Sequence, residues 1–168
     1  MGRGYVNASA PPPSPRPYDR PMDEHISSDK RLQWLIDRAE IAEWLVRYAR
    51  CIDRRDWTAL QDSYTDDGVM QHGEASVPRA QMPELSAKIL AGCASSHHLV
   101  GDPSIVIDGD HAVTHSHYIA THISEGTRVK RQGGGWYDCE LQRTDRGWRF
   151  TRVRSTTAWR TGEPLQLH

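Results

Sequence analysis

Histidines are concentrated in one segment of the chain, and they are the side chains best suited to chemistry. The segment contains six of the nine histidines: His97, His98, His111, His115, His117 and His122. Imidazole exchanges protons near neutral pH, and it is also a common metal ligand. The segment therefore offers either acid–base catalysis or a metal site, and the elements that position these side chains decide between the two.

The residues that precede this segment are predicted to be mainly helical. Apolar residues recur at spacings of three and four over residues 28–52, as in an amphipathic helix. We expect Asp56 to cap a second, short helix and Pro78 to open a third, which ends at Gly92. A short strand that begins at Val69 is expected between the second and third helices.

Beyond Gly92 the pattern predicts β-structure. Strands are expected at 96–107, 111–123, 127–131, 136–144 and 147–158. The tight turns are expected at residues 108–110 and 145–147. Helices followed by antiparallel strands predict an α+β fold, with three N-terminal helices packed on a strongly curved, mainly antiparallel sheet. A curved sheet with helices across its mouth forms a cone, and deep apolar cavities of this kind bind small molecules.

The alternation of side chains along 111–123 decides which histidines face such a cavity. Small residues and a tyrosine occupy the even positions, as expected of a cavity wall. The even set is Ala112, Thr114, Ser116, Tyr118, Ala120 and His122. His115 and His117 therefore point to the opposite face.

A metal site is the competing interpretation of the histidines. The spacing from Gly109 to His115 and His117 matches the opening of the cupin metal motif. However, Glu125 lies eight residues past His117, too late for that motif, and no second motif follows. A cupin-like metalloprotein is thus the weakest hypothesis, and we expect neither a metal nor a cofactor.

Composition and charge exclude several other classes of protein. The chain has 21 Lys and Arg against 22 Asp and Glu, so it lacks the basic field of a nucleic-acid binder. No apolar run reaches the length of a membrane span. The three cysteines are widely spaced and form no CxxC motif, which favours a reducing cytoplasm. The Pro-rich residues 1–25 are expected to form a disordered or extended tail, and 26–168 a single domain.

Several stretches, in order, resemble the SnoaL-like family of the nuclear transport factor 2-like superfamily. The longest is IAEWLVRYARCIDRRDWTALQDSYTDDGVM, residues 41–70. The later pieces SSHHLVGDPSIVIDGDHAV, GGGWYDCELQRTDRGWRF and TTAWRTGEP are also similar to this group. The resemblance covers residues 28–163 and implies a cone-shaped α+β barrel.

The resemblance also implies catalytic residues, because the superfamily includes scytalone dehydratase and bile-acid 7α-dehydratase. Its dehydratases place an Asp at the end of the first helix, in the context D-x-x-D-W, which here is Asp53. They place a His at the start of a later strand, which here is His97. Scytalone dehydratase has a second His 25 residues on, which here is His122. Tyr48 stands five residues before the aspartate, as in the bile-acid enzyme. The neighbour His98 leaves open which histidine enters the cavity.

The implied activity is that of a cofactor-independent dehydratase (lyase) or isomerase that acts on a hydrophobic hydroxylated or keto substrate. Asp53 would orient His97, which moves the proton, while Tyr48 or His122 stabilises the developing enolate. A polyketide, aromatic or steroid-like compound would suit such a cone. The residues expected to bind substrate are Tyr118, Trp57, Met70, His98 and Tyr137. Scytalone dehydratase has a Tyr where Ile52 stands here, so its substrate does not transfer.

A non-catalytic role is the main alternative. Dioxygenase small subunits of the same superfamily show that this fold can serve as a ligand-binding or assembly module. Under the enzymatic hypothesis the partner is a small hydrophobic substrate. In either case we expect a homodimer or homotrimer, because this fold usually associates through its open sheet face.

Overall fold

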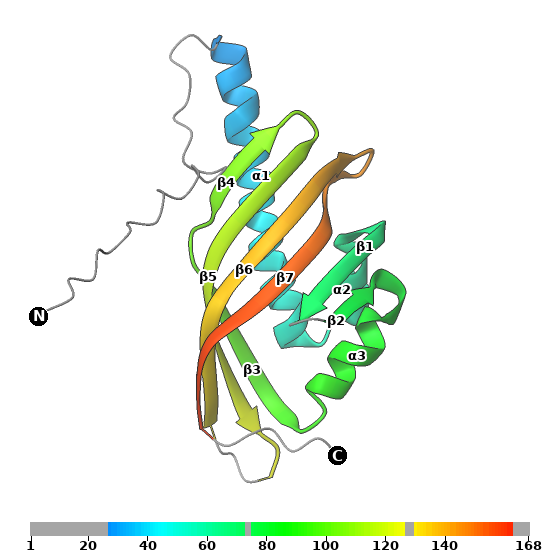
Figure 1. Ribbon diagram of the computed structural model, residues 1–168, viewed down its shortest axis with the longest axis vertical. Coiled ribbons are helices and arrows are strands. Elements are labelled where there is room, and N and C mark those ends of the chain that lie inside the picture. Colours follow the sequence, from blue (N-terminus) through cyan, green and yellow to red (C-terminus); the bar gives the residue numbers. More distant parts are fainter. Residues whose placement is uncertain (1–26, 73–74, 127–129, 163–168) are drawn as a thin grey trace, which may run out of the picture.

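The computed structural model describes residues 27–72, 75–126 and 130–162 (Figure 1). The tail expected at 1–25 lies outside the described residues, as does the end of the expected domain, residues 163–168.

Helices form the first part of the described chain, in the predicted order. They are α1 (Ser28–Arg54), α2 (Trp57–Asp62), the 3-10 turn η2 (Arg79–Gln81) and α3 (Met82–Ile89). Asp56 caps α2 as predicted, because its carboxylate accepts a hydrogen bond from the Ala59 N–H at 3.0 Å. The third helix begins later than expected: Pro78 precedes η2, and Pro83 occupies the first turn of α3, where an N–H would have no partner within the helix. No helix in these ranges has both the length and the apolar character needed to cross a bilayer.

The strands form one mixed, mostly antiparallel sheet that is not closed into a barrel. They are β1 (Tyr64–His72), β2 (Ala75–Pro78), β3 (Cys93–Val100), β4 (Ser104–Asp108), β5 (His111–Ser124), β6 (Lys130–Thr144) and β7 (Gly147–Thr161). The order is β2-β1-β7-β6-β5-β3, with β4 also paired to β5, and only the β1–β7 pair is parallel. The helix α1 runs along one face of this sheet (Figure 1). The predicted α+β class is confirmed.

The prediction of a single strand at 96–107 is wrong, because the structure has two strands there, β3 and β4. The break falls at residues 101–103, where Pro103 has no N–H for a ladder hydrogen bond. Gly101 donates its N–H to the carbonyl of His117 at 2.8 Å, and the chain then turns away. As a result β3 pairs with the second half of β5, and β4 pairs with the first half.

The two strands expected at 127–131 and 136–144 are one strand, β6, in the described part from Lys130 onward. The glycines at 133–135 fall in the interval between the two expected strands, and they lie inside β6. A Cβ at Gly134 would lie 2.6 Å from the Trp159 ring, and one at Gly135 would collide with the Thr156 carbonyl. These glycines therefore permit β7 to approach closely at a bulge, where the register of the β6–β7 pair shifts.

The core fills the space between α1 and the sheet. Ile41, Leu45 and Tyr48 of α1 are buried against Trp148 and Phe150 of β7. The first turns of α1 depart from the expected apolar face: Leu32, Leu35 and Ile36 are 59%, 55% and 44% exposed. Figure 1 gives the reason, since this end of α1 projects past the edge of the sheet.

An ion pair joins α1 to the β6–β7 hairpin. The Asp37 carboxylate, 5% exposed, accepts hydrogen bonds from the Arg143 Nη1 and Nη2 atoms at 2.8 and 2.7 Å. The indole of Trp148 donates to the same carboxylate at 3.3 Å, and the Arg143 guanidinium stacks 4.5 Å above its ring. The hydrogen bonds from Arg143 lower the pKa of Asp37 despite its burial.

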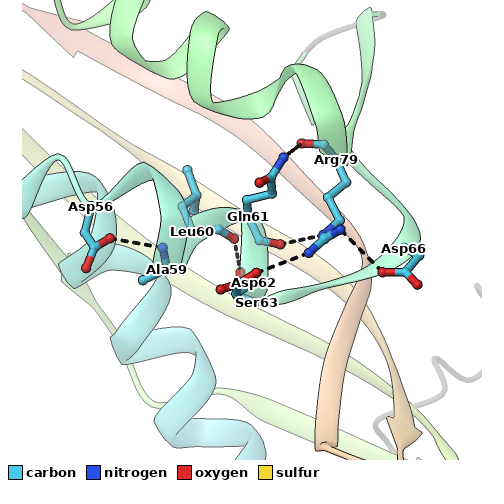
Figure 2. A network of polar contacts seen from close by, with 8 residues as sticks. All are labelled: Asp56, Ala59, Leu60, Gln61, Asp62, Ser63, Asp66 and Arg79. Atoms are coloured by element: carbon cyan, nitrogen blue, oxygen red, sulfur yellow. Dashed lines mark hydrogen bonds and ion pairs between the residues drawn. The ribbon is translucent and has the colours of Figure 1, made fainter.

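A second network holds α2 against the segment that leads into α3 (Figure 2). The Arg79 guanidinium lies 3.2 Å from the Asp62 carboxylate and 3.3 Å from that of Asp66. Its Nε atom donates to the Gln61 carbonyl at 2.9 Å, and the Gln61 amide returns a bond to the Arg79 carbonyl at 3.2 Å. These contacts fix the segment from which α3 begins, and α3 packs beside α2.

Candidate active site

A buried carboxylate–imidazole pair lies where α1 ends beside β3. The Nδ1 atom of His98 is 2.7 Å from the Asp53 Oδ1 atom, and the His98 backbone N–H donates to Oδ2 at 2.8 Å. The two side chains are 8% and 19% exposed, respectively. An ionised carboxylate only accepts hydrogen bonds, so Nδ1 carries a proton, and in the neutral imidazole the lone pair is then on Nε2. This arrangement gives His98 the form of a general base.

The strand β3 decides which of two adjacent histidines meets Asp53. Beyond a register shift near Cys93, Ser96, His98 and Val100 face the helix side, while Ser95, His97 and Leu99 are exposed on the outer face. The expected pairing of Asp53 with His97 is therefore wrong, because His97 points away from α1. The sequence left this choice open, since both faces of β3 carry a histidine and an apolar residue.

Hydrogen bonds keep the Asp53 carboxylate charged. Burial raises the pKa of Asp53, but the side-chain and backbone bonds from His98 and the bond from Ser96 outweigh it and lower that pKa to about 2. An aspartate in the last turn of a helix is otherwise unfavourable, because the negative end of the helix dipole lies there. The polar contacts from β3 offset that repulsion.

Ser96 and Arg55 complete the support of the pair. The Ser96 hydroxyl donates to Asp53 Oδ1 at 2.9 Å and lies 2.7 Å from Arg55 Nη1. Arg55 caps α1 in the left-handed conformation (φ 59°) and also donates to the Ile52 carbonyl at 2.7 Å. Neither residue is among those expected from the sequence. The i, i+2 spacing of Ser96 and His98 was the available signal, since it places both on one face of a strand.

Next to His98 the structure contains a cavity of about 220 Å³. Its walls come from the end of α1, from β1, from α3 and from the long strands β3, β5, β6 and β7. The lining residues are Tyr48, Ile52, Met70, Gln71, Leu85, Ser86, Ile89, Leu90, His98, Tyr118, Ala120, His122, Arg131, Gly133, Tyr137, Ser155, Thr157 and Arg160. The wall is thus largely apolar, with histidine, tyrosine and arginine groups directed into it.

Most residues expected at the site line this cavity. They are Tyr48, Met70, His98, Tyr118, Tyr137 and His122. Asp53 does not line the cavity but lies behind His98, within hydrogen-bond distance of its ring. Trp57 departs from the expectation, because it packs against the hydrophobic core and is not part of the wall.

The second histidine of the cavity is held neutral. The His122 ring lies edge-on to the His98 ring, with centroids 5.4 Å apart and planes at 88°. Burial, followed by electrostatic interactions with His98, Arg131 and Arg55, lowers the pKa of His122 to about 4. At neutral pH this imidazole therefore carries one N–H donor and no charge.

Tyrosines form the deep wall of the cavity. The Tyr118 ring stacks on that of Tyr137 at 4.5 Å, and its hydroxyl lies 3.1 Å from the Thr157 hydroxyl. Tyr48 meets the Tyr137 and Phe150 rings edge-on. Burial raises the pKa of Tyr48 well above its usual value, so its phenol stays protonated and remains a possible hydrogen-bond donor.

His115 and His117 lie on the opposite face of β5, as the alternation predicted. The His115 Nδ1 atom is 2.7 Å from the Asp138 Oδ1 atom, and the two histidine rings meet edge-on at 5.5 Å. Within residues 27–72, 75–126 and 130–162, no three His, Cys, Asp or Glu side chains converge as metal ligands would.

This combination of fold and cavity agrees with a family model for the SnoaL-like domain, which matches residues 33–154. The chain belongs to the SnoaL-like family. The predicted resemblance is thereby confirmed at the level of family and fold.

Relatives of this SnoaL-like chain include proteins of known sequence and proteins of known structure. The uncharacterized protein Rv2910c of Mycobacterium tuberculosis is 28% identical over 120 residues, which cover 69% of this chain and 82% of that protein. The crystal structure of the Kfla4162 protein from Kribbella flavida superposes with a TM-score of 0.68 at 27% identity, covering 75% of this chain and 93% of that one. Hexachlorocyclohexane dehydrochlorinase LinA-type3 from Novosphingobium barchaimii shares the fold (TM-score 0.71, 15% identity, 79% and 94% coverage).

Proposed function

We propose that this protein is a cofactor-independent lyase or isomerase that removes a proton from carbon with the Asp53–His98 pair. The observation that carries the proposal is the hydrogen-bonded pair at the cavity wall, with the His98 Nδ1 atom 2.7 Å from Asp53. The negative carboxylate stabilises the imidazolium that forms and holds the ring in place. The family membership and the elimination chemistry in the name of the dehydrochlorinase support this choice.

The proposed reaction balances without a redox partner. The Nε2 atom of His98 takes a proton from a carbon next to a carbonyl group, and the C–H electron pair forms an enolate. In an elimination, the electrons return to make a C=C bond as a β-hydroxyl leaves, and the His98 imidazolium gives that hydroxyl its proton, so water is released. In an isomerisation, the same proton returns to another carbon of the enolate.

Under this proposal, two neutral donors stabilise the enolate oxygen. His122 is uncharged near neutral pH, as its pKa of about 4 requires, and its ring lies beside that of His98. Tyr48 lines the same cavity and keeps its phenolic proton. A preorganised donor of this kind typically contributes about 10²–10³ in rate.

The volume of the cavity favours a compact substrate. At about 220 Å³ it is smaller than the roughly 300–1,000 Å³ of sites for drug-sized ligands. Of the compounds that the resemblance implied, a hydroxylated or keto compound with one or two rings is therefore the best match, and a steroid is a poorer one.

The test is an assay of purified protein against a panel of small hydroxy-ketones and hydroxylated ring compounds, followed by ultraviolet absorbance of the new conjugated double bond. We expect His98→Ala to lower kcat by about 10²–10⁴ and Asp53→Asn to lower it in the same direction. His97→Ala is the matched control, since it removes the neighbouring imidazole from the outer face and should leave kcat unchanged.

The outcome separates this proposal from the alternative of a non-catalytic module. Equal turnover by the native protein and His98→Ala would rule out the proposed base. If panel compounds bind in the cavity and the native protein converts none of them, the ligand-binding role is the better description.

A further inference from the structure

Two arginines enter the cavity from neighbouring strands, at the end of the sheet where β6 begins and β7 ends. They are Arg131 of β6 and Arg160 of β7. Arg160 lies directly across from Gly133, which is two residues from Arg131 on the same face of β6. Diagonal neighbours of this kind are close enough for long side chains to act on one group. Gly133 has no side chain, which leaves room between them, and a Cβ there would lie 3.5 Å from Arg160 Cγ.

A β-bulge is the reason that Arg160 faces the cavity. Ser155 and Thr157 of β7 line it, so simple alternation would direct Trp159 inward next. The register instead shifts between the pairs Gly134–Trp159 and Gly135–Thr157, which leaves one extra residue on β7. Trp159 is thereby turned outward over Gly134, and Arg160 takes the inward position. Bulges commonly redirect a side chain next to an active site.

Positive charge in this part of the cavity has no acidic counterpart among the described residues. Neither Arg131 nor Arg160 forms an ion pair within those ranges, and no Asp or Glu is part of the cavity wall. Two other arginines of the sheet are matched with acids, Arg143 with Asp37 and Arg152 with Glu140. Two unmatched guanidinium groups beside an apolar cavity are suited to a ligand that supplies the negative charge.

We propose that Arg131 and Arg160 form an anion subsite, and that the substrate of this enzyme is a small carboxylic acid whose apolar body extends toward His98. The guanidinium group binds a carboxylate with two parallel N–H donors, a geometry that an ammonium lacks. The carboxylate is bound at this end, and the reacting carbon is directed to His98. This inference rests on the proposed function for its substrate, but the subsite itself can be tested by binding alone.

The test compares 2-naphthoate with its neutral isostere 2-naphthamide by isothermal titration calorimetry. We expect native protein to bind the carboxylate at least about ten-fold more tightly than the amide, as for charge-assisted contacts. Arg131→Gln and Arg160→Gln should each reduce this preference, and the double variant should abolish it. Arg146→Gln is the matched control, because it removes an exposed arginine from the turn at the other end of β6 and β7.

Two further measurements make the result decisive. Raising the salt concentration should weaken naphthoate binding and leave naphthamide binding unchanged, which needs no variant. If His98→Ala still prefers naphthoate to naphthamide but no longer turns over the substrate panel, both proposals are supported. If native protein prefers naphthoate but turns over no compound of the panel, the subsite is supported and only the proposed base is overturned. Equal binding of the two probes, no saturable binding of naphthoate, or a preference that persists in the double arginine variant would overturn the subsite.

Discussion

His122 couples the proposed site to the stability of the protein through its proton affinity. Its neighbours are His98 and Asp53, together with the guanidinium groups of Arg131 and Arg55. Burial, followed by electrostatic interactions with His98 and the two arginines, lowers the pKa of His122 from 6.5 to about 4, although Asp53 acts in the opposite direction. The neutral ring that the proposed mechanism uses as a donor is therefore a consequence of its surroundings.

The protein should consequently become less stable as the pH is lowered through the range in which the proton affinity of His122 differs between the folded and unfolded chains. Between pH 6.5 and pH 4 the unfolded chain binds a proton at His122 that the folded chain does not, so the free energy of unfolding decreases as the pH drops. A shift of this size, reduced because the ring is partly exposed, corresponds to about 1–2 kcal/mol. Asp53 affects stability mainly at lower pH, because folding lowers its pKa from 3.8 to about 2.

The measurement is urea denaturation of native protein and His122→Gln across this range. We expect the variant to lose about 1–2 kcal/mol less than native protein between pH 7 and pH 4. His111→Gln, at an exposed position at the start of β5, serves as the control and should follow the native curve. Parallel curves for native protein and His122→Gln would show that His122 is not held neutral.

The elements depend on a few long-range contacts that tie α1 to the sheet. Asp37 lies in the part of α1 that precedes the buried stretch, and its contacts with Arg143 and Trp148 are over 100 residues away in sequence. Since the first turns of α1 bury few apolar side chains, this ion pair is their main attachment within the described residues.

Asp37→Asn should therefore destabilise the protein. The change leaves a partly buried Arg143 without its closest charge, and we expect a loss of about 2 kcal/mol, below the ~3–5 kcal/mol of a fully buried pair because Arg143 is 31% exposed. Asp110→Asn removes the other carboxylate on Arg143, at 3.0 Å but 72% exposed, and should cost less than about 1 kcal/mol. Urea denaturation at pH 7 measures both, and equal losses would contradict the account.

Much of this element arrangement could be predicted from the sequence. The apolar period over 28–52 and the cap at Asp56 indicate α1 and α2, and the turn at 108–110 separates two strands as expected. The continuity of β6 through the glycines at 133–135 was not predicted, because these glycines serve a close approach of β7, which is a contact between distant residues. Residues 96–107 form two strands for a similar reason: β3 pairs with the second half of β5, and β4 pairs with the first half.

At the scale of the whole molecule, the outer face of the sheet carries solvent-exposed apolar side chains. Leu99 and Ile119 are paired across β3 and β5 and are 60% and 45% exposed, and Trp159 is 46% exposed. Apolar groups gathered on one face commonly mark an interface. A second copy of this chain remains the partner that we propose for it.

We expect the protein to be a homodimer or homotrimer by size-exclusion chromatography with light scattering, and Leu99→Glu with Ile119→Glu to convert it to a monomer. A charge on this face would be buried unpaired in the assembly, which typically costs several kcal/mol. Leu32→Glu, which changes an equally exposed leucine on α1, is the control and should leave the assembly intact. A monomeric native protein, or dissociation by Leu32→Glu alone, would contradict a sheet-face interface.

The sequence by itself determined the family, the α+β class and the aspartate of the proposed dyad, because periodicity, capping residues and local motifs express these within short stretches. It also placed His122, and not His115 or His117, on the inner face of β5, since alternation is a local property of a strand. Only the tertiary structure decided that His98 meets Asp53 and that Arg160 enters the cavity in place of Trp159. Both choices depend on how one strand is aligned with distant elements, and a shift of one residue reverses which face every side chain takes.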